Sequence, residues 1–157
     1  MVVVGIIGLL AAMGLPSIFK ALQKEGMRKG VDDVEGVFFS AREQAIVFNK
    51  TVAVTFYPRE RKFGVDGTTG TAGADGTVVN LHSGRTVMAT LPEGVTLYGL
   101  GIYRKDYTTS EWAKIYFNPD GTSDEAVIIL LDRVGGKSDK ITLEYATGMP
   151  DVSAVDQ

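Results

Sequence analysis

The chain begins with nineteen residues that carry no charge, and this run constrains the fold more than any other feature. From Met1 to Phe19 the sequence reads MVVVGIIGLLAAMGLPSIF. The core of a bilayer requires about 20 predominantly apolar residues at about 1.5 Å of rise per residue. The run therefore just reaches the length of a membrane-spanning helix.

Two other interpretations of this run are a cleaved secretory signal and a helix buried in a soluble domain. A secretory signal opens with basic residues and ends in a small-residue cleavage site, whereas no basic residue precedes this run and a helical pattern follows it. A helix that is apolar on all sides must be enclosed by lipid or by a large protein, and the rest of this chain is too small for that.

Residues 1–19 are therefore predicted to be the transmembrane and assembly half of a longer helix. Pro16 removes one backbone hydrogen bond and should kink or locally unwind this half. The residues expected to serve as membrane anchor and assembly surface are Val2, Val3, Val4, Ile6, Ile7, Leu9, Leu10, Leu15 and Pro16.

Residues 20–50 are predicted to continue the helix as an amphipathic half. Its apolar residues alternate at spacings of four and three, the period of a helix that covers an apolar surface. They are Met27, Val31, Val34, Phe38, Ala41, Ala45 and Phe48. We expect this stripe to pack on a sheet of the same chain, although a coiled-coil partner would satisfy the same pattern. Gly26, Gly30 and Gly36 each weaken a helix by about 1 kcal/mol unless a bend or close packing requires them.

Residues 51–157 are predicted to form a glycine-rich β domain, because apolar and polar residues alternate in short runs. The predicted strands cover 51–57, 62–65, 78–81, 85–91, 95–100, 114–117, 126–131 and 140–145. Asn118-Pro119-Asp120-Gly121 and Gly135-Gly136 have the composition of hairpin turns. Thr147-Gly148 with Pro150 should end the last strand.

Residues 66–76, DGTTGTAGADG, are expected to form a mobile low-complexity loop. Asp66 and Asp75 in this loop have the chemistry to flank a cation, although a solvated loop explains them better. Five aromatic residues cluster in the middle of the chain: Tyr98, Tyr103, Tyr107, Trp112 and Tyr116. Such a cluster is compatible with a binding surface enriched in aromatic residues, but core and strand packing explains it better.

The residues required by common enzyme sites are missing. The chain has no cysteine and a single histidine, His82, which excludes disulfides, thiolate metal sites and multi-histidine sites. Gly136-Lys137-Ser138 lacks the earlier glycine of a phosphate-binding loop, and neither G-x-S-x-G nor H-E-x-x-H occurs. We therefore predict no catalytic residue, no metal and no cofactor.

The distribution of charge disfavours nucleic acid as a partner. After Lys62 the chain carries seven basic and thirteen acidic residues, whereas nucleic-acid binding requires a basic surface. Arg104, Lys105 and Lys114 would have to converge to form one.

The order of these segments resembles the type IV pilin and type II secretion pseudopilin superfamily. Within it, three segments are similar to the H-type minor pseudopilins: VEGVFFSAREQAIVFNKTVAVTFY at 34–57, IYFNPDGTS at 115–123 and KITLEYATGMPDV at 140–152. The resemblance covers nearly the whole chain. It implies an α+β fold in which one long N-terminal helix packs on an antiparallel β-sheet or β-sandwich domain.

The chain departs from that family at its start. Family members begin with a short basic leader, a glycine and F-T-L-I-E, none of which stands before or after Met1. In the family, cleavage exposes a phenylalanine that is methylated, and the glutamate pairs with a neighbour's amine within the membrane, where a lone carboxylate is costly. We expect Met1 to be an internal methionine with several anchor residues upstream.

The resemblance implies a non-enzymatic subunit of the periplasmic pseudopilus in type II protein secretion. The chain would cross the bacterial inner membrane once, with the β domain, residues 51–157, in the periplasm. Its partners would be other pseudopilins and inner-membrane lipid, with no nucleic acid and no small-molecule substrate. Two alternatives are a minor type IV pilin involved in pilus assembly or DNA uptake, and a membrane-tethered enzyme whose carboxylate site forms only in three dimensions.

Overall fold

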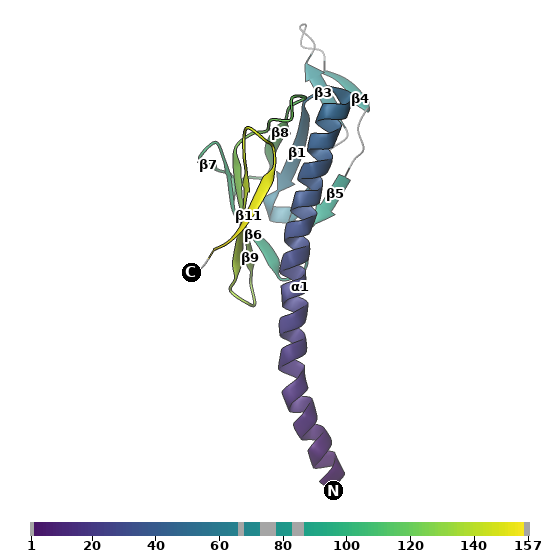
Figure 1. The fold of residues 1–157 in the computed structure, drawn as a ribbon, viewed down its shortest axis with the longest axis vertical. Helices are drawn as coiled ribbons and strands as arrows, with labels where there is room; N and C mark the ends of the chain where they lie inside the picture. The colour runs from purple at the N-terminus through teal and green to yellow at the C-terminus, as the bar shows by residue number, and fades with distance from the viewer. Residues whose placement is uncertain (1, 66–67, 73–77, 83–86, 156–157) are drawn as a thin grey trace.

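One long helix, α1 (Val2–Phe48), sets the architecture of the chain. The computed structural model describes the backbone of residues 2–65, 68–72, 78–82 and 87–155, and the side chains of residues 25–65 and 87–155. Figure 1 shows the second half of α1 lying against the strands, while the first half projects beyond them. The predicted long N-terminal helix is confirmed.

The predicted membrane segment has helical backbone from Val2 onward. Its predicted anchor residues, from Val2 to Pro16, lie outside the residues whose side chains are described. In the part of the chain that the structure does describe, no helix combines the length and the apolar character needed to span a membrane.

The strands form two large antiparallel sheets and one small hairpin. The first sheet has the order β5-β2-β1-β8 and consists of β1 (Val52–Tyr57), β2 (Lys62–Val65), β5 (Val87–Thr90) and β8 (Ala113–Phe117). The second has the order β11-β10-β9-β6-β7 and consists of β6 (Val95–Ile102), β7 (Lys105–Asp106), β9 (Ala126–Asp132), β10 (Ser138–Leu143) and β11 (Pro150–Val155). A short helix, η1 (Pro58–Glu60), links β1 to β2, and β3 (Thr68–Ala72) pairs with β4 (Val78–His82).

The amphipathic half of α1 lies in the core between the chain's own sheets, which it contacts on both sides. Phe38 is fully buried, and its ring centroid lies 6.0 Å from that of Phe56 and 5.7 Å from that of Phe117. Phe56 in turn stacks on Phe63 at 5.5 Å. Phe38 therefore contacts two strands of the first sheet, β1 and β8, and Phe56 extends the aromatic cluster to β2.

The buried face of α1 is wider than the predicted stripe and ends earlier. Six of the seven stripe residues are buried: Met27, Val31, Val34, Phe38, Ala41 and Ala45. The seventh, Phe48, is 43% exposed, because it is the last residue of the helix and the chain turns away there into β1. Val37 and Gln44, which the spacing did not include, are buried as well.

Gly30 has a packing reason to be glycine, unlike Gly36. A Cβ at Gly30 would lie 3.4 Å from a methyl of Val95 and 3.6 Å from the ring of Pro92, so the helix approaches β6 closely there. A Cβ at Gly36 would meet no described atom within 4 Å. Close packing therefore explains the first glycine, and nothing in the structure explains the second.

Three predictions about the strands require correction. Part of the predicted mobile loop 66–76 is β3, whereas Asp66 and Asp75 lie outside the described residues. The turn at 118–121 does not join a hairpin, because β8 and β9 belong to different sheets and only an isolated bridge, Phe117 to Ser123, follows it.

The third correction is an additional strand at the C-terminal end. Gly148, at φ +60°, reverses the chain after β10, and β11 then pairs along β10 from Leu143–Pro150 to Ser138–Val155. Pro150 is tolerated because it is the first residue of an edge strand, where a missing amide donor is harmless. The predicted turn at Gly135-Gly136 does join a hairpin, β9 to β10.

Replacing Phe38 with alanine should destabilise the fold far more than replacing its neighbour Phe39. Phe38 is 0% exposed and Phe39 is 47% exposed. Phe38→Ala should lower the free energy of unfolding by about 3–5 kcal/mol, because it leaves a cavity between the helix and the first sheet. Phe39→Ala should change it by no more than about 0.5 kcal/mol. Chemical unfolding of the full chain in mild detergent, followed by circular dichroism, measures both, and equal losses would contradict the helix orientation.

Candidate functional site

The three segments that carry the family resemblance meet at one side chain, Arg42. Its Nε donates a hydrogen bond to the carbonyl oxygen of Thr147 at 3.0 Å and a longer one to that of Gly121 at 3.4 Å. Arg42 lies in the first of those segments, Gly121 in the second and Thr147 in the third. We call this meeting point the Arg42 junction.

Two glycines allow the backbone to approach Arg42 this closely. Gly121 has φ +86°, and a Cβ there would lie 3.2 Å from Nη2 of Arg42. Gly148 has φ +60°, and a Cβ there would lie 2.6 Å from the carbonyl oxygen of Gly121. Larger residues at either position would strain the backbone; at Gly148 the Cβ would also clash with the Gly121 carbonyl oxygen, and at Gly121 it would press on the Arg42 side chain. The junction therefore requires both glycines as well as the arginine.

The turn at residues 118–122, which contains Gly121, is stabilised by hydrogen bonds among its own side chains. The Asp120 carboxylate accepts hydrogen bonds from the amide of Thr122 at 3.0 Å and from its hydroxyl at 2.7 Å. These two bonds lower the pKa of Asp120, because they stabilise its charged form. Asn118 also donates to the Thr122 hydroxyl at 3.0 Å. The turn is thus a fixed support for the Arg42 contacts.

Asp124 joins the two sheets at the same end of the domain. Its carboxylate accepts the hydroxyl of Tyr103 at 2.7 Å, from the β6–β7 turn of the second sheet, and the amide of Tyr116 at 3.0 Å, from β8 of the first. The hydrogen bond to Asp124 raises the pKa of Tyr103 to about 12, with smaller contributions from desolvation and from the carboxylate's charge. Tyr103 and the following Arg104 both have positive φ, 47° and 64°, as a tight antiparallel turn requires.

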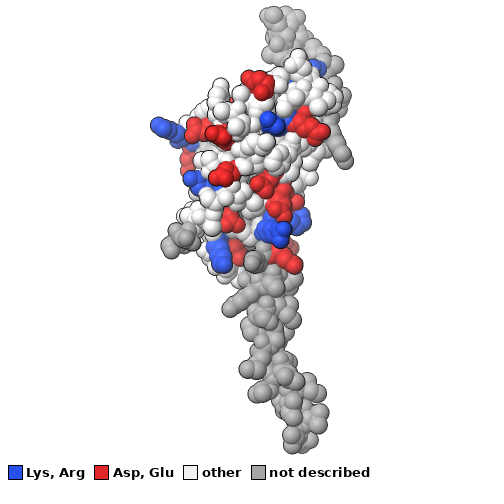
Figure 2. All heavy atoms as spheres, in the orientation of Figure 1, with Lys and Arg blue, Asp and Glu red and all other residues white. Residues whose placement is uncertain are grey.

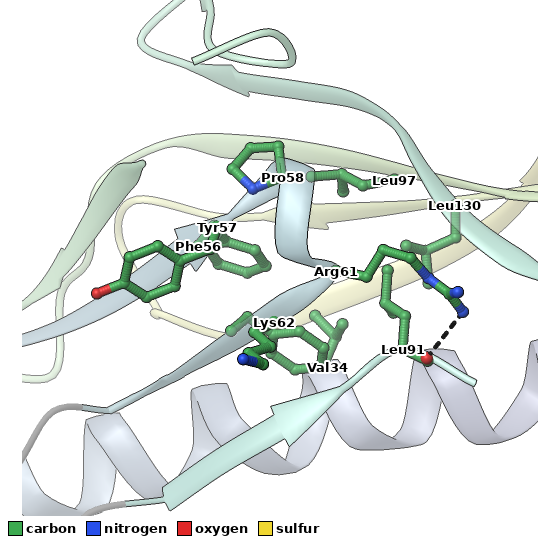
Figure 3. A pocket seen from close by; sticks show the side chains of 10 residues that line it. Val34, Phe56, Tyr57, Pro58, Arg61, Lys62, Leu91, Leu97 and Leu130 are labelled. Carbon is green, nitrogen blue, oxygen red and sulfur yellow. Dashed lines mark hydrogen bonds between the residues drawn. The ribbon is translucent and has the colours of Figure 1, made fainter. Parts of the chain in front are cut away.

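A small cavity lies between η1 and the β5–β6 connection. It measures about 10 Å³, which is about the space of one water molecule. Figure 3 shows Arg61 beside it, with a hydrogen bond from Nη2 to the carbonyl oxygen of Leu91 at 3.0 Å. The same nitrogen also donates to the carbonyl oxygen of Pro92. Arg61 is therefore a structural tie rather than a ligand-binding residue.

Groups that could hold a metal or build a basic surface do not gather in the described part of the chain. No cluster of three or more histidine or carboxylate residues occurs there. Lys105 lies over the ring of Tyr107 at 5.2 Å, and Lys114 lies over that of Trp112 at 5.5 Å. Figure 2 shows basic and acidic residues interspersed on the visible face. The visible face thus carries no basic patch.

Sequence reasoning missed Arg42 because the apolar stripe reports only which residues of the helix face the core, and Arg42 is not among them. The signal that would have found it was the coincidence of three similar segments far apart in the chain, which pointed to a common contact. The predicted stripe, from Met27 to Ala45, lies in the core on the adjacent face of α1. The stripe residues thus pack in the core, whereas Arg42 binds the two turns at one end of the domain.

No family model and no curated protein matches the sequence. Two solved structures resemble the chain. The minor pseudopilin EpsH from the type 2 secretion system of Vibrio cholerae is 12% identical, with a TM-score of 0.52, over 82% of this chain and 95% of that one. The type IV minor pilin FimU of Pseudomonas aeruginosa is 8% identical, with a TM-score of 0.50, over 85% of this chain and 90% of that one. At such identities the likeness shows the fold, and the predicted pilin-like α+β fold is confirmed.

Removing the Arg42 side chain should loosen both turns that it holds. Arg42→Ala should lower the free energy of unfolding by about 1 kcal/mol, because two carbonyl groups, one of them part-buried, lose a charged donor. Arg42→Lys should recover only part of this, since lysine lacks the Nε donor at that position. Arg28→Ala is the matched control, because the Arg28 side chain is 82% exposed and forms an ion pair with Asp32, four residues along the same helix. A loss at Arg28 equal to that at Arg42 would contradict the junction.

Tyr103 should titrate above the ordinary pKa of a tyrosine. Its pKa is about 12 in the folded chain against an ordinary 10.0, so the stability from its bond to Asp124 is complete below about pH 10 and is lost as the pH rises through about 12. The ultraviolet absorbance of tyrosinate measures this step. Tyr103→Phe should remove the step, and Asp124→Asn should move it toward the ordinary value; an unchanged titration in both variants would disprove the assignment.

Proposed function

We propose that this chain, which has the pilin-like fold, is a non-enzymatic structural subunit of a membrane-rooted filament. The observation that carries the proposal is the shape of α1. Its second half is covered by both sheets, while its first half projects beyond the domain. The projecting half includes the nineteen uncharged residues. A helix of this kind, free of its own domain, is suited to lipid or to the helices of neighbouring subunits.

We further propose that the filament is the periplasmic pseudopilus of type II protein secretion, with this chain as a minor pseudopilin. Residues 1–19 would cross the bacterial inner membrane, residues 20–50 would form the amphipathic half of α1, and residues 51–157 would lie in the periplasm. The similarity of the three segments at the Arg42 junction to H-type minor pseudopilins supports this choice.

In this function the helices of different subunits exchange lipid contacts for contacts with one another. Small residues in the first half of α1, among them Gly5, Gly8 and Ala12, permit close approach of helix backbones. Partners would thus be other pseudopilins and inner-membrane lipid. The interspersed charges in Figure 2 give no support to nucleic acid, and the described residues offer no metal cluster for catalysis.

A charge placed in the uncharged run should release the chain from membranes. Leu10→Arg should cost about 2.5–3.5 kcal/mol of insertion free energy, and the full chain expressed in its host should shift from the membrane fraction to the soluble fraction. Val47→Arg is the control, because Val47 lies at the opposite end of α1 and is 66% exposed. Release of neither variant, or of both, would argue against a membrane anchor in residues 1–19.

Co-purification of an epitope-tagged full chain distinguishes the two filament types. Complexes isolated from detergent-solubilised membranes of host cells should contain the chain together with other pseudopilins. Recovery with a major type IV pilin instead would assign the chain to the alternative, a minor type IV pilin in pilus assembly or DNA uptake. Absence from both kinds of complex would disprove the filament proposal.

A further inference from the structure

Strand β11, yellow in Figure 1, is the last strand of the second sheet. It pairs with β10 along its whole length, and no described strand lies on its other side. A strand in this position presents unpaired amide and carbonyl groups, which are a template for another strand. Most proteins protect such an edge with charges, with a bulge or by keeping the strand very short.

The hydrogen-bond ladder indicates which groups of β11 are free. Just beside the ladder, the amide of Glu144 donates to the carbonyl oxygen of Met149 at 3.2 Å. Hydrogen-bonded pairs alternate with non-bonded pairs in an antiparallel ladder, so every second residue of β11 from Asp151 onward bonds to β10. The amides and carbonyl groups of Val152 and Ala154 consequently point away from β10, toward the free edge.

The edge of β11 lacks the protection that the opposite edge of the same sheet has. There, β7 is only two residues long, and both of them, Lys105 and Asp106, are charged. β11 is six residues long, and its residues from Val152 to Val155 are exposed and uncharged. Pro150 lacks an amide, but it is only the first residue of the strand. β11 can therefore accept a further strand along most of its length.

An apolar groove of about 970 Å³ lies beside this edge, between α1 and β11. Its apolar wall consists of Met27, Val31, Val134, Val152 and Ala154. Val152 pairs directly with the fully buried Ile141, so its side chain points to the inner face of the sheet. A strand added beside β11 would point every second side chain to that same face. These side chains would enter the groove and contact the wall that α1 provides.

The charged groups of the groove that are free to meet a partner balance one another. Arg28 and Asp32 pair with each other at 3.8 Å. The buried Asp132 accepts a backbone amide of its own turn at 3.0 Å. Asp139 and Lys137 then remain, one of each sign. An uncharged apolar side chain consequently fits the groove better than a charged one, which would lose its hydration without gaining a partner.

We propose that β11 and this groove bind an extended segment of a different subunit, which adds to the second sheet as a further strand beside β11. The backbone of the segment hydrogen-bonds to the free groups of Val152 and Ala154. Its apolar residues, at every second position, enter the groove. In strand addition of this kind, the backbone bonds give affinity and the pockets for alternate side chains give selectivity.

The β11 strand of a second copy fits this edge less well than a segment of a different subunit. Antiparallel pairing of two β11 strands about a two-fold axis would point the two α1 helices in opposite directions. That arrangement is incompatible with two chains rooted in one membrane. The choice of a different subunit therefore rests on the proposed function, whereas the capacity of β11 to accept a strand does not.

Proline substitutions test which groups of β11 are free. Val152→Pro removes an amide that points to the free edge, whereas Ser153→Pro removes one that bonds to β10. In the full chain in mild detergent, Ser153→Pro should lower the midpoint of thermal unfolding by several degrees more than Val152→Pro. Circular dichroism measures both midpoints. Equal losses would show that the free groups are not those of Val152, and would overturn the proposal.

A synthetic peptide tests strand addition directly. The probe is a short fluorescein-labelled peptide in which valine and threonine alternate, with a lysine at each end for solubility. Fluorescence anisotropy should show saturable binding to the full chain in detergent micelles, and Val152→Pro should weaken it several-fold. Ser153→Ala is the matched control, because it keeps the edge groups and the groove, and it should bind as the parent chain does. The same peptide with every amide N-methylated should bind several-fold more weakly.

The groove is tested by placing a charge on either side of the contact. Val134→Glu puts a carboxylate in the groove wall at a side chain that is 69% exposed, so the fold should be kept. This variant should weaken peptide binding several-fold, and a peptide with glutamate in place of valine should also bind several-fold more weakly. Absence of saturable binding would overturn the proposal, as would binding that ignores the proline, the methyl groups and the charges.

Purification of the tagged full chain from host membranes distinguishes this inference from the proposed function. Val152→Pro should lower the recovery of other pseudopilins several-fold, and unchanged recovery would disprove the edge contact alone. A chain that binds the peptide but recovers no pseudopilin retains strand addition at β11 and loses the proposed function. A dimer of the chain alone that Val152→Pro abolishes would assign the edge to a second copy and overturn the proposal.

Discussion

The fold depends on the burial of one face of α1 by both sheets at once. Each sheet has an apolar inner face, and α1 packs against strands of both sheets. Phe38 shows the dependence most directly, since its ring contacts Phe56 and Phe117 from different strands of the first sheet. Val95 and Leu130 of the second sheet approach the same helix at Gly30. The helix is therefore the common core element rather than an attachment to a finished β domain.

Hydrophobic periodicity predicted the helix and most strands because it reports which faces are removed from water. It predicted the stripe from Met27 to Ala45 but extended it to Phe48, since periodicity does not show where a helix leaves its sheet. It missed β11, whose residues are mostly exposed and therefore carry little alternating pattern. Turn composition was similarly limited: Asn118 to Gly121 does make a turn, but composition does not tell which sheet the next strand joins.

The contacts that shape the distal end of the domain could not be derived from pattern at all. Arg42 bonds to carbonyl oxygens 79 and 105 residues away in sequence, and any residue supplies a carbonyl oxygen. Asp124 likewise joins Tyr103 to Tyr116 across two sheets. Such polar contacts depend on the completed fold, because only the packed core brings the turns within reach. The similarity of the three segments to one family pointed to this end of the domain. The structure explains it, because the three segments meet at Arg42.

The extent of the helix–sheet contact has a mechanical consequence. The buried face runs from Met27 to Ala45, which corresponds to about 27 Å of helix, and Figure 1 shows the strands of both sheets running broadly along the helix rather than across it. A force pulling on the free end of α1 would act along this interface, so that many side-chain contacts would have to slide together before any separated. Contacts loaded in this way resist more than contacts peeled apart one by one. A domain that packs along its helix in this way can be pulled by the helix without unfolding first.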